Sequence, residues 1–447
     1  MFRNWLLLVA ATVALPVLAQ ESAPPSVEDV DQRLRILERK LELEKEAAAA
    51  KEKDAAKVSI GADGFTFKSA DGSYVLKIRG YVHADLRVYG NDVKVATTDT
   101  FLMRRVRPIF EAQLGKLAEV RVMPDFGAGT TVLQDAYADV KFAPWLKLRA
   151  GKFKPPVGLE RLQSATDLAF VERALPTNLV PNRDLGVQLF GDLWAGIVSY
   201  QAGVFDGVAD GASGDIDIND SKELEGRIWI SPFKTKPASV LKDLSFGVVA
   251  TDGKNLGTLT ATGLSPYRSA GQLTFFSYRS GRTLADTVIA DGNRKRFGAQ
   301  ASFQNGRVAA QAEWVRSSVE VLRGETLARL QHSASQATVQ ILLTKDRAAL
   351  KGFVPRRPFD PAARQLGALE VALRVGRLTI DDHAFPVFAD PATSAKAARE
   401  KGVGLNWYLT RNLKISLDGI ETRFDALTDQ VERERERVLL SRVQIAF

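Results

Sequence analysis

The sequence predicts an all-β fold: a transmembrane antiparallel β-barrel of about 16 strands, preceded by a short coiled-coil helix. Three observations lead to this prediction. An apolar segment near the N-terminus is typical of exported proteins, and apolar and polar residues alternate from residue 58 to residue 447. The composition excludes a helical membrane protein, because mean hydropathy is -0.10 and charged residues make up 26% of the chain.

The first 20 residues have the pattern of a secretory signal peptide. Arg3 precedes an apolar run over residues 5–18, and Leu18-Ala19-Gln20 provides a context of small residues for cleavage. The apolar run is too short to span a bilayer comfortably, although a retained membrane anchor is the alternative. Residues 1–20 are therefore predicted to direct export. The absence of cysteine argues against a small fold held by disulfides.

Residues 21–57 are predicted to be a helical coiled-coil segment in the periplasm. From Ser26 to Lys57 the pattern is helical, and apolar residues recur at alternating spacings of three and four. These seam residues are Val27, Val30, Leu34, Leu37 and Leu41. So short a seam favours a role in registering a larger oligomer, and the alternative is a lone, partly frayed charged helix.

The barrel is predicted over residues 58–447, where the period of the pattern changes to two. In the segment from Leu76 to Tyr89, apolar residues share one parity and charged residues share the other. Short turns are expected at Gly115-Lys116-Leu117, Pro144-Trp145 and Asn305-Gly306, all at one tight-turned end. The longer polar loops are expected at residues 206–220, 284–292 and 425–437. Hydrocarbon tolerates no open sheet edge, so such strands are expected to close into a barrel.

The C-terminal residue Phe447 is expected to act as an assembly signal. Leu439, Val443, Ile445 and Phe447 share one parity, so the last strand is apolar on one face and ends in an aromatic residue. This pattern resembles the signal read by the barrel assembly machinery of the outer membrane, which is therefore an expected partner.

If the apolar parity faces lipid, the other parity faces a lumen that is net positive. Its basic residues are Lys77, Arg79, Arg87, Arg105, Arg107, Arg121, Lys141, Lys147, Arg149, Arg294, Arg296, Arg374, Lys414 and Arg442. Its acidic residues are Asp85, Glu111, Glu119, Asp125, Asp135, Asp139, Glu313, Glu370 and Asp418. A basic lumen concentrates anions, and rings of Arg and Lys favour their passage. The alternative is a lumen of mixed charge, in which basic residues opposite acidic loops only set an electric field across the pore.

Seven segments, in order, resemble the phosphate-selective porin O and P family. The first three are residues 151–160 (GKFKPPVGLE), 170–175 (FVERAL) and 181–186 (PNRDLG). Next come residues 202–207 (AGVFDG), 275–278 (FFSY) and 355–361 (PRRPFDP), and a final match covers residues 404–409 (GLNWYL). The resemblance extends from Gly61 to Phe447. It implies a sixteen-stranded, usually trimeric barrel in the outer membrane.

The resemblance also implies a loop that folds into the lumen and constricts it, expected here near residues 152–183. This segment breaks the alternation and is too long for a surface turn. Its basic residues, expected to carry anions, are Lys152, Lys154, Arg161, Arg173 and Arg183. The alternative is that its acidic residues pair with these bases and lock the loop. Those acidic residues are Glu160, Asp167, Glu172 and Asp184.

Family members guide anions from the outer side along an arginine ladder. Its counterpart, placed by region, is Arg268, Arg279, Arg282, Arg294 and Arg296, with Arg356 and Arg357 nearby in the pattern. The sequence departs from the family pattern at Val157, which stands in place of an aromatic residue, and at Ala174, which stands in place of a serine. The lost hydroxyl bears on phosphate preference more than on the fold.

The expected function is passive, anion-selective diffusion of phosphate or related oxyanions across the outer membrane of a Gram-negative bacterium. The expected partners are small anions, outer-membrane lipid with lipopolysaccharide, and two further copies in a homotrimer, without nucleic acid, cofactor or metal. One alternative is a porin for other solutes, such as organic anions, polyphosphate or sugars. Tyr81, Tyr137 and Trp229 have lumenal parity but form no continuous aromatic track.

A remote alternative from another class is a barrel enzyme, which needs a nucleophile activated by a base. The sequence has three histidines, His83, His332 and His383, and no serine in a nucleophile-elbow motif. An enzyme is therefore not expected.

Overall fold

The computed structural model describes residues 26–447 except 91–97, 218 and 428–433. The predicted signal peptide, residues 1–20, lies outside the described residues. The chain divides into two compact units, one up to Ala56 and one from Lys57 to Phe447.

The N-terminal unit contains one helix, α1 (Val27–Asp54). Ser26 caps it, because its side-chain oxygen accepts a hydrogen bond from the backbone N–H of Asp29 at 3.2 Å. Val27, Val30, Leu34, Leu37 and Leu41 are all exposed. The helix is thus confirmed, and its pairing in a coiled coil stays a prediction. Among the described residues no helix is long and apolar enough to cross a membrane.

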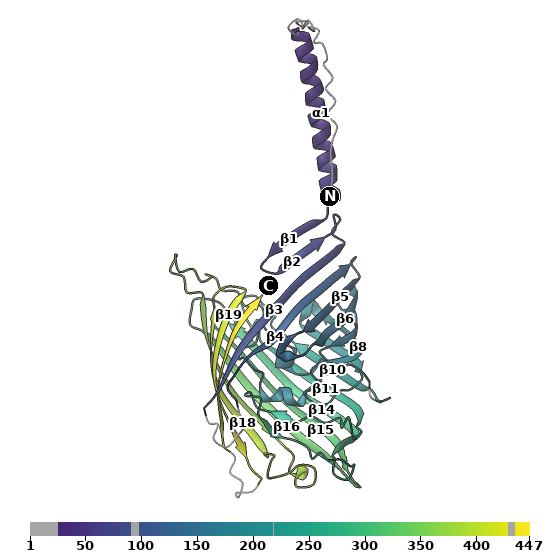
Figure 1. The fold of residues 1–447 in the computed structure, drawn as a ribbon, viewed down its shortest axis with the longest axis vertical. Coiled ribbons are helices and arrows are strands. Elements are labelled where there is room, and N and C mark those ends of the chain that lie inside the picture. Colours follow the sequence, from purple (N-terminus) through teal and green to yellow (C-terminus); the bar gives the residue numbers. More distant parts are fainter. Residues whose placement is uncertain (1–25, 91–97, 218, 428–433) are drawn as a thin grey trace, which may run out of the picture. The chain divides into compact units, whose positions relative to one another are not determined.

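The second unit is a closed antiparallel β-barrel of 16 strands, as the alternation predicts (Figure 1). Its first nine strands are β3 (Tyr74–Tyr89), β4 (Thr100–Leu114), β5 (Ala118–Asp125), β6 (Val132–Ala143), β7 (Leu146–Phe153), β8 (Asp184–Leu193), β9 (Val198–Phe205), β10 (Glu223–Ile230) and β11 (Ser245–Leu256). The other seven are β14 (Ile289–Asn305), β15 (Val308–Arg323), β16 (Thr326–Leu342), β17 (Ala368–Thr379), β18 (Ala397–Tyr408), β19 (Leu413–Asp425) and β20 (Glu436–Ala446). Closure follows from the antiparallel pairing of β20 with β3.

Shorter elements complete the unit. A hairpin of β1 (Lys57–Gly61) and β2 (Gly64–Lys68) pairs with the start of β3. The remaining elements are β12 (Tyr267–Arg268), β13 (Thr274–Phe276), α2 (Leu159–Leu162) and 3-10 turns at Gly127–Gly129, Leu175–Leu179, Trp194–Gly196 and Asp382–Ala384. Phe447 exchanges two backbone hydrogen bonds with Gly80, of 2.8 and 2.9 Å, so the last residue is tied to β3.

The predicted parity holds along the strands that close the barrel. On β3, Tyr81, His83, Asp85 and Arg87 are buried towards the lumen, and the apolar residues between them face outward. Arg442 on β20 lies directly opposite Asp85 and donates two hydrogen bonds of 2.7 Å to its carboxylate. This buried ion pair bridges the first and last strands across the seam of the barrel.

The two ends of the barrel differ in a way that the sequence predicts only in part. The turns at Gly115–Leu117 and Pro144–Trp145 are confirmed, at the end where the chain terminates, called here the terminal end. The third turn consists of Gly306 and Arg307, one residue later than predicted, because Asn305 still pairs with Val308. The terminal end is not tight throughout, since the longer segments 231–244 and 343–367 also lie there.

The opposite end, called here the loop end, carries most of the long connections. Segments 257–288 and 380–396 pack together over this end with strands β15 and β16. Tyr267, Phe275, Phe276, Leu378 and Phe388 belong to the resulting apolar cluster, and all are buried. The predicted loop 284–292 is shorter than expected, because β14 already begins at Ile289.

Candidate functional site

The connection between β7 and β8, residues 154–183, folds into the barrel and crosses its lumen. It is anchored on the far wall, where the Glu313 carboxylate of β15 accepts the backbone N–H of Leu159 at 2.5 Å. The Asp418 carboxylate of β19 accepts the backbone N–H of Val171, also at 2.5 Å. We call residues 154–183 the lumenal loop. It lies where the constriction is predicted, except that Lys152 belongs to β7.

An aromatic side chain fixes the middle of the lumenal loop. Phe170 is buried against β18, where Gly402 leaves room for it: a Cβ there would come within 2.9 Å of the ring. The Arg374 guanidinium of β17 lies 4.2 Å from the centre of the same ring and donates to the Glu172 carbonyl oxygen at 2.8 Å. These contacts hold the loop as a rigid element of the lumen.

The carboxylate of Glu172 gathers arginines from the barrel wall. Arg104 donates to it at 2.6 Å and Arg87 at 3.2 Å, and a guanidinium nitrogen of Arg105 lies 3.9 Å away. Burial by itself would raise the pKa of Glu172, but the charges of Arg104 and Arg105 outweigh it and hold this pKa well below its usual range. Glu172 is therefore ionised at neutral pH and pins the loop to β3 and β4.

The basic residues of the loop itself are held by uncharged partners. Arg161 donates to the Asn182 side chain at 3.0 Å and to the Thr177 carbonyl at 2.6 Å. Arg173 donates to the carbonyls of Glu160 and Gln163, and Lys154 donates to those of Leu162 and Gln163. Throughout the described part of the chain, no carboxylate oxygen lies within 4.0 Å of these three cationic groups.

Crowding of like charge is visible at two of these groups. Burial, followed by the charges of Arg183 and Arg173, lowers the pKa of Lys154 well below its usual value. Burial and the charge of Arg173 lower the pKa of Arg161 to about 9. Burial is the larger cause of both shifts and nearby positive charge the second, so an anion bound beside these groups would favour their charged forms.

The loop acids do not neutralise the loop bases. Glu160 accepts the Ala174 N–H, and Asp167 accepts the Gly352 N–H at 3.0 Å. Asp184 accepts backbone N–H groups of Leu185, Gly207 and Val208. The acids therefore satisfy backbone donors and wall arginines. This arrangement orders the loop without removing its positive charge.

A cavity lies on each side of the lumenal loop, and Arg107 and Arg183 line both. The loop-end cavity has a volume of about 470 Å³, and the terminal-end cavity about 790 Å³. The basic residues of the loop-end cavity are Arg104, Arg105, Arg107, Arg161, Arg173, Arg183 and Arg268. Its acidic residues are Asp125, Glu172 and Asp210. The two shared arginines are paired, Arg107 with Asp125 at 2.7 Å and Arg183 with Asp135 at 3.2 Å.

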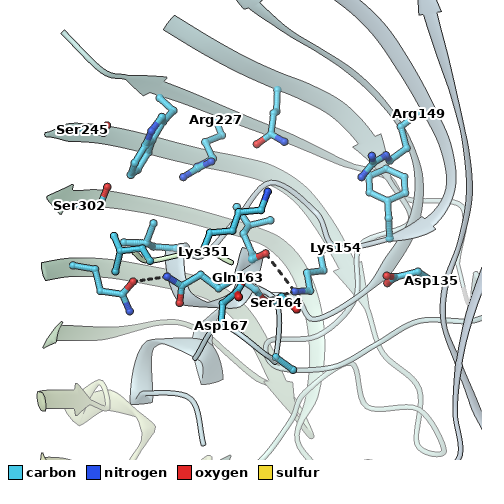
Figure 2. Close-up of a pocket in the computed structure, with 18 of the residues that line it drawn as sticks. Asp135, Arg149, Lys154, Gln163, Ser164, Asp167, Arg227, Ser245, Ser302 and Lys351 are labelled. Carbon is cyan, nitrogen blue, oxygen red and sulfur yellow. Dashed lines mark hydrogen bonds between the residues drawn. The ribbon is translucent and has the colours of Figure 1, made fainter. Parts of the chain in front are cut away.

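The terminal-end cavity collects bases from segments far apart in the sequence. Figure 2 shows Lys154 of the lumenal loop, Lys351 of the segment 343–367, and Arg149 and Arg227 of the wall around the same space. Its basic residues are Arg107, Arg121, Arg149, Lys154, Arg183, Arg227, Lys234, Lys242 and Lys351. Its acidic residues are Asp135, Asp167 and Asp243. Both cavities are thus lined by more bases than acids.

Several predicted path residues are paired inside the barrel. Arg79 and Arg121 share Glu111, with N–O distances of 2.7 and 2.8 Å. Arg149 donates two hydrogen bonds to Asp139 and lies 3.9 Å from the ring centre of Tyr137. Other predicted residues with acidic partners are Lys147 with Asp192, Lys152 with Asp215 and Lys141 with Glu119. Lys77 lies beside Glu111 in a small side cavity.

The five arginines of the predicted outer ladder do not lie in one row. Arg268 lines the loop-end cavity, whereas Arg294 and Arg296 are buried against Glu223. Arg279 contacts the Pro386 carbonyl and Asp390, and Arg282 is exposed on segment 257–288. Arg356 and Arg357 belong to segment 343–367, so they lie at the terminal end and not beside the ladder.

Sequence reasoning missed several residues of the site. Arg104 is the extra residue of a bulge, because Arg105 pairs with His83 and Met103 pairs with Ala84. Strict alternation would predict that Arg104 faces lipid. In the structure its guanidinium instead donates to the Glu172 carboxylate. Arg227 shares the parity of Trp229, which is a signal that could have found it.

The histidines have structural partners. His332 is buried, hydrogen-bonded to the Tyr278 hydroxyl at 2.8 Å, and His83 is buried beside Arg105 at 3.4 Å. His383 is exposed and contacts Asp381 at 2.9 Å. In the described residues, none of the three is hydrogen-bonded to a serine or threonine hydroxyl.

Comparison with known proteins agrees with the geometry. No curated protein matches the sequence. Among solved structures, the outer membrane channel DcaP of Acinetobacter baumannii is similar, with a TM-score of 0.55 at 11% identity over 85% of this chain and 99% of that one. OmpF of Salmonella typhi, in complex with daunomycin, gives a TM-score of 0.52 at 10% identity, over 84% and 98% of the two chains.

A third similar structure is the trimer form of OmpT from Vibrio cholerae, with a TM-score of 0.50 at 9% identity over 84% of this chain and 100% of that one. At such identities these structures support the fold alone. The model of the phosphate-selective porin O and P family matches residues 76–447, which includes the whole barrel except the first two residues of β3. This chain therefore belongs to the phosphate-selective porin O and P family and is a porin.

Proposed function

We propose that this porin mediates passive, anion-selective diffusion, with phosphate or related oxyanions as its preferred solutes. The observation that carries the proposal is the way Lys154, Arg161 and Arg173 are held. Carbonyl and amide oxygens fix their positions, and among the described residues no carboxylate oxygen lies within 4.0 Å of them. A base paired with a carboxylate attracts a passing anion weakly, whereas a base held by neutral acceptors keeps its charge for the solute.

The two cavities form the proposed route of the solute, and the three basic residues line it. The loop-end cavity holds Arg161 and Arg173, and the terminal-end cavity holds Lys154. An anion that enters either side meets an excess of bases, and the paired Arg107 and Arg183 lie at the junction. Guanidinium groups suit oxyanions because their planar fork donates two hydrogen bonds at once.

The proposed setting is the outer membrane of a Gram-negative bacterium, reached through the signal peptide at residues 1–20. Short connections typically face the periplasm in such barrels, so the terminal end is assigned to that side and the loop end to the outside. The trimer form of OmpT supports a homotrimer for this chain as well. Helix α1 would then align three copies through its exposed seam.

The first test is the ion preference of the purified porin in a planar bilayer. With a tenfold gradient of potassium chloride, the zero-current potential is expected to have the sign that reports faster movement of chloride than of potassium. The reason is the surplus of bases over acids around both cavities. A potential of the opposite sign would reject the anion assignment.

The second test addresses oxyanions. Adding phosphate at about millimolar concentration should reduce chloride conductance, because an ion held by two or more cationic groups leaves more slowly than chloride. Gluconate at the same ionic strength is the matched control and should reduce conductance less. If phosphate and gluconate act alike, the pore is a general anion pore without an oxyanion site.

A further inference from the structure

One half of the barrel wall carries basic side chains on its outer surface. On β14 to β20, in the part of each strand nearest the loop end, exposed bases alternate with buried lumenal residues. These eight residues, called here the cationic band, are Lys295, Arg316, Arg329, Arg377, Arg399, Lys401, Arg423 and Arg437. The acids that pair with the band are fewer: Asp252 on the neighbouring strand β11, and Glu320, Glu421 and Asp425.

Three arginines of the band oppose one another across neighbouring strands. Arg377 on β17 is the direct partner of Arg399 on β18, which is the direct partner of Arg423 on β19. Like charges placed directly opposite on one face destabilise a sheet. Arg399 contacts Asp425 at 2.7 Å and Arg423 contacts Glu421 at 2.8 Å. These contacts offset only part of the repulsion.

Among the described residues, three members of the band, Arg316, Arg377 and Lys401, have no acidic partner within 4.0 Å. Arg377 and Lys401 are both exposed, and Lys401 lies two residue pairs from Arg377 along the β17–β18 ladder, opposite Val375. The outer wall therefore has a surplus of positive charge at one level, whereas the adjacent lumenal residues Arg374 and Glu400 are paired with each other.

The other half of the wall has no such band. At the same end of β4 to β9, the exposed outward side chains include Phe101, Met103, Leu133, Val187 and Val204. On the described residues of these six strands, no lysine or arginine is exposed. This apolar half fits contact between copies, whereas the charged half must face surroundings that carry negative charge at the membrane surface.

A groove lies next to the band, on the side towards the middle of the membrane. It has a volume of about 810 Å³ and runs over β16 to β20 and β3. Its apolar lining includes Val339, Val375, Val403 and Leu439, and Lys401 and Arg437 also border it. Gly419 faces it from β19, where an added Cβ would meet no heavy atom within 4 Å. The missing side chain leaves space for an alkyl chain.

We propose that the cationic band and this groove bind a phosphorylated lipid of the outer leaflet. Its phosphate would lie among Arg377, Arg399 and Lys401, and one acyl chain would follow the groove over Gly419. A phosphate there relieves the repulsion in the row of arginines, and the acyl chain covers apolar surface that is otherwise concave. The inference rests on the proposed placement of the loop end at the outer face.

The test uses the full-length porin, purified in a zwitterionic detergent, with lipid A as the probe. Lipid A is expected to raise the thermal unfolding midpoint in a saturable way. Dephosphorylated lipid A and inorganic phosphate should each raise it much less, because each supplies half of the contacts. An equal shift with inorganic phosphate alone would make the band an ion site and overturn the lipid proposal.

Variants separate the site from general charge effects. Arg377→Gln with Lys401→Gln should weaken the apparent affinity for lipid A about tenfold, while leaving detergent-only stability unchanged or higher. The matched control, Lys116→Gln with Arg307→Gln, changes two exposed bases in turns of the terminal end and should respond like the parent. Gly419→Phe should fill the groove and also weaken binding.

Ion preference in the bilayer separates this inference from the proposed transport function. The Arg377→Gln/Lys401→Gln variant changes only the outer wall, so its zero-current potential should equal that of the parent. If lipid A stabilises this variant as strongly as the parent, the site is refuted whatever the ion preference proves to be.

Discussion

Replacing Lys154 and Arg173 together by glutamate is expected to turn the channel from preferring anions to preferring cations. When Lys154 and Arg173 are both protonated, the change amounts to four charge units at groups that border the two cavities. A unit charge about 6 Å from an ion changes its energy by roughly 0.7 kcal/mol at the dielectric constant of water. Four units give roughly 3 kcal/mol before screening, so a shift of ion preference of at least about tenfold is expected.

The measurement is the zero-current potential in a potassium chloride gradient, with single-channel conductance as a check on folding. Lys154→Gln with Arg173→Gln, which removes the charges without reversing them, should give an intermediate potential. Lys116→Glu with Arg307→Glu places the same change in turns outside the cavities and should have little effect. A folded glutamate variant with the parent's potential would show that the lumenal loop does not set the selectivity.

The barrel could be predicted from the sequence because the requirements on each strand are visible within that strand. Each strand must present an apolar face to lipid and pair its backbone with the next strand, and both demands appear as a period of two. The parity of β3 is therefore correct residue by residue. It fails where a bulge adds a residue, as at Arg104 opposite the step from His83 to Ala84.

The lumenal loop was located by its break in alternation and by the family resemblance, but its contacts could not be predicted. Leu159 and Glu313 are 154 residues apart, and Val171 and Asp418 are 247 residues apart. Only closure of the barrel brings these partners together. Local sequence likewise could not tell that Glu172 would pair with wall arginines while Arg161 and Arg173 would take carbonyl oxygens.

The terminal end shows the same limitation. Segment 343–367 breaks the alternation as a long loop does, and nothing in its sequence says on which side of the membrane it lies. Its side follows from the count of strands before it, which the sequence gives only approximately. Once the strands are in place, Lys351 reaches the terminal-end cavity, and the backbone N–H of Gly352 donates to Asp167. Segment 343–367 thereby supports the lumenal loop from the terminal end of the barrel.

Glu172→Gln is expected to be the most destabilising single change in the lumenal loop. The variant leaves Arg87, Arg104 and Arg105 close together without the carboxylate that joins them. Removing one partner of a buried ion pair costs about 3 to 5 kcal/mol. Urea unfolding in detergent, followed by loss of the compact form, should show a clearly lower midpoint for the variant.

Glu119→Gln is the matched control, because its pair with Lys141 is partly exposed to solvent and solvent-exposed pairs contribute at most about 1 kcal/mol. If Glu172→Gln and Glu119→Gln unfold at the same urea concentration, the Glu172 cluster does not hold the loop.

The pH dependence of the Glu172 effect has a definite sign. The pKa of Glu172 is lowered in the folded protein below the ordinary value of 4.5, because the charges of Arg104 and Arg105 outweigh burial. A carboxyl group of this kind stabilises the fold fully above its unfolded pKa and loses that contribution as pH falls towards its folded pKa. The stability difference between the parent and Glu172→Gln should therefore be constant near neutral pH and shrink progressively below about pH 4.5. A difference that stayed constant into that acidic range would mean that packing of the side chain, and not its charge, fixes the loop to the wall.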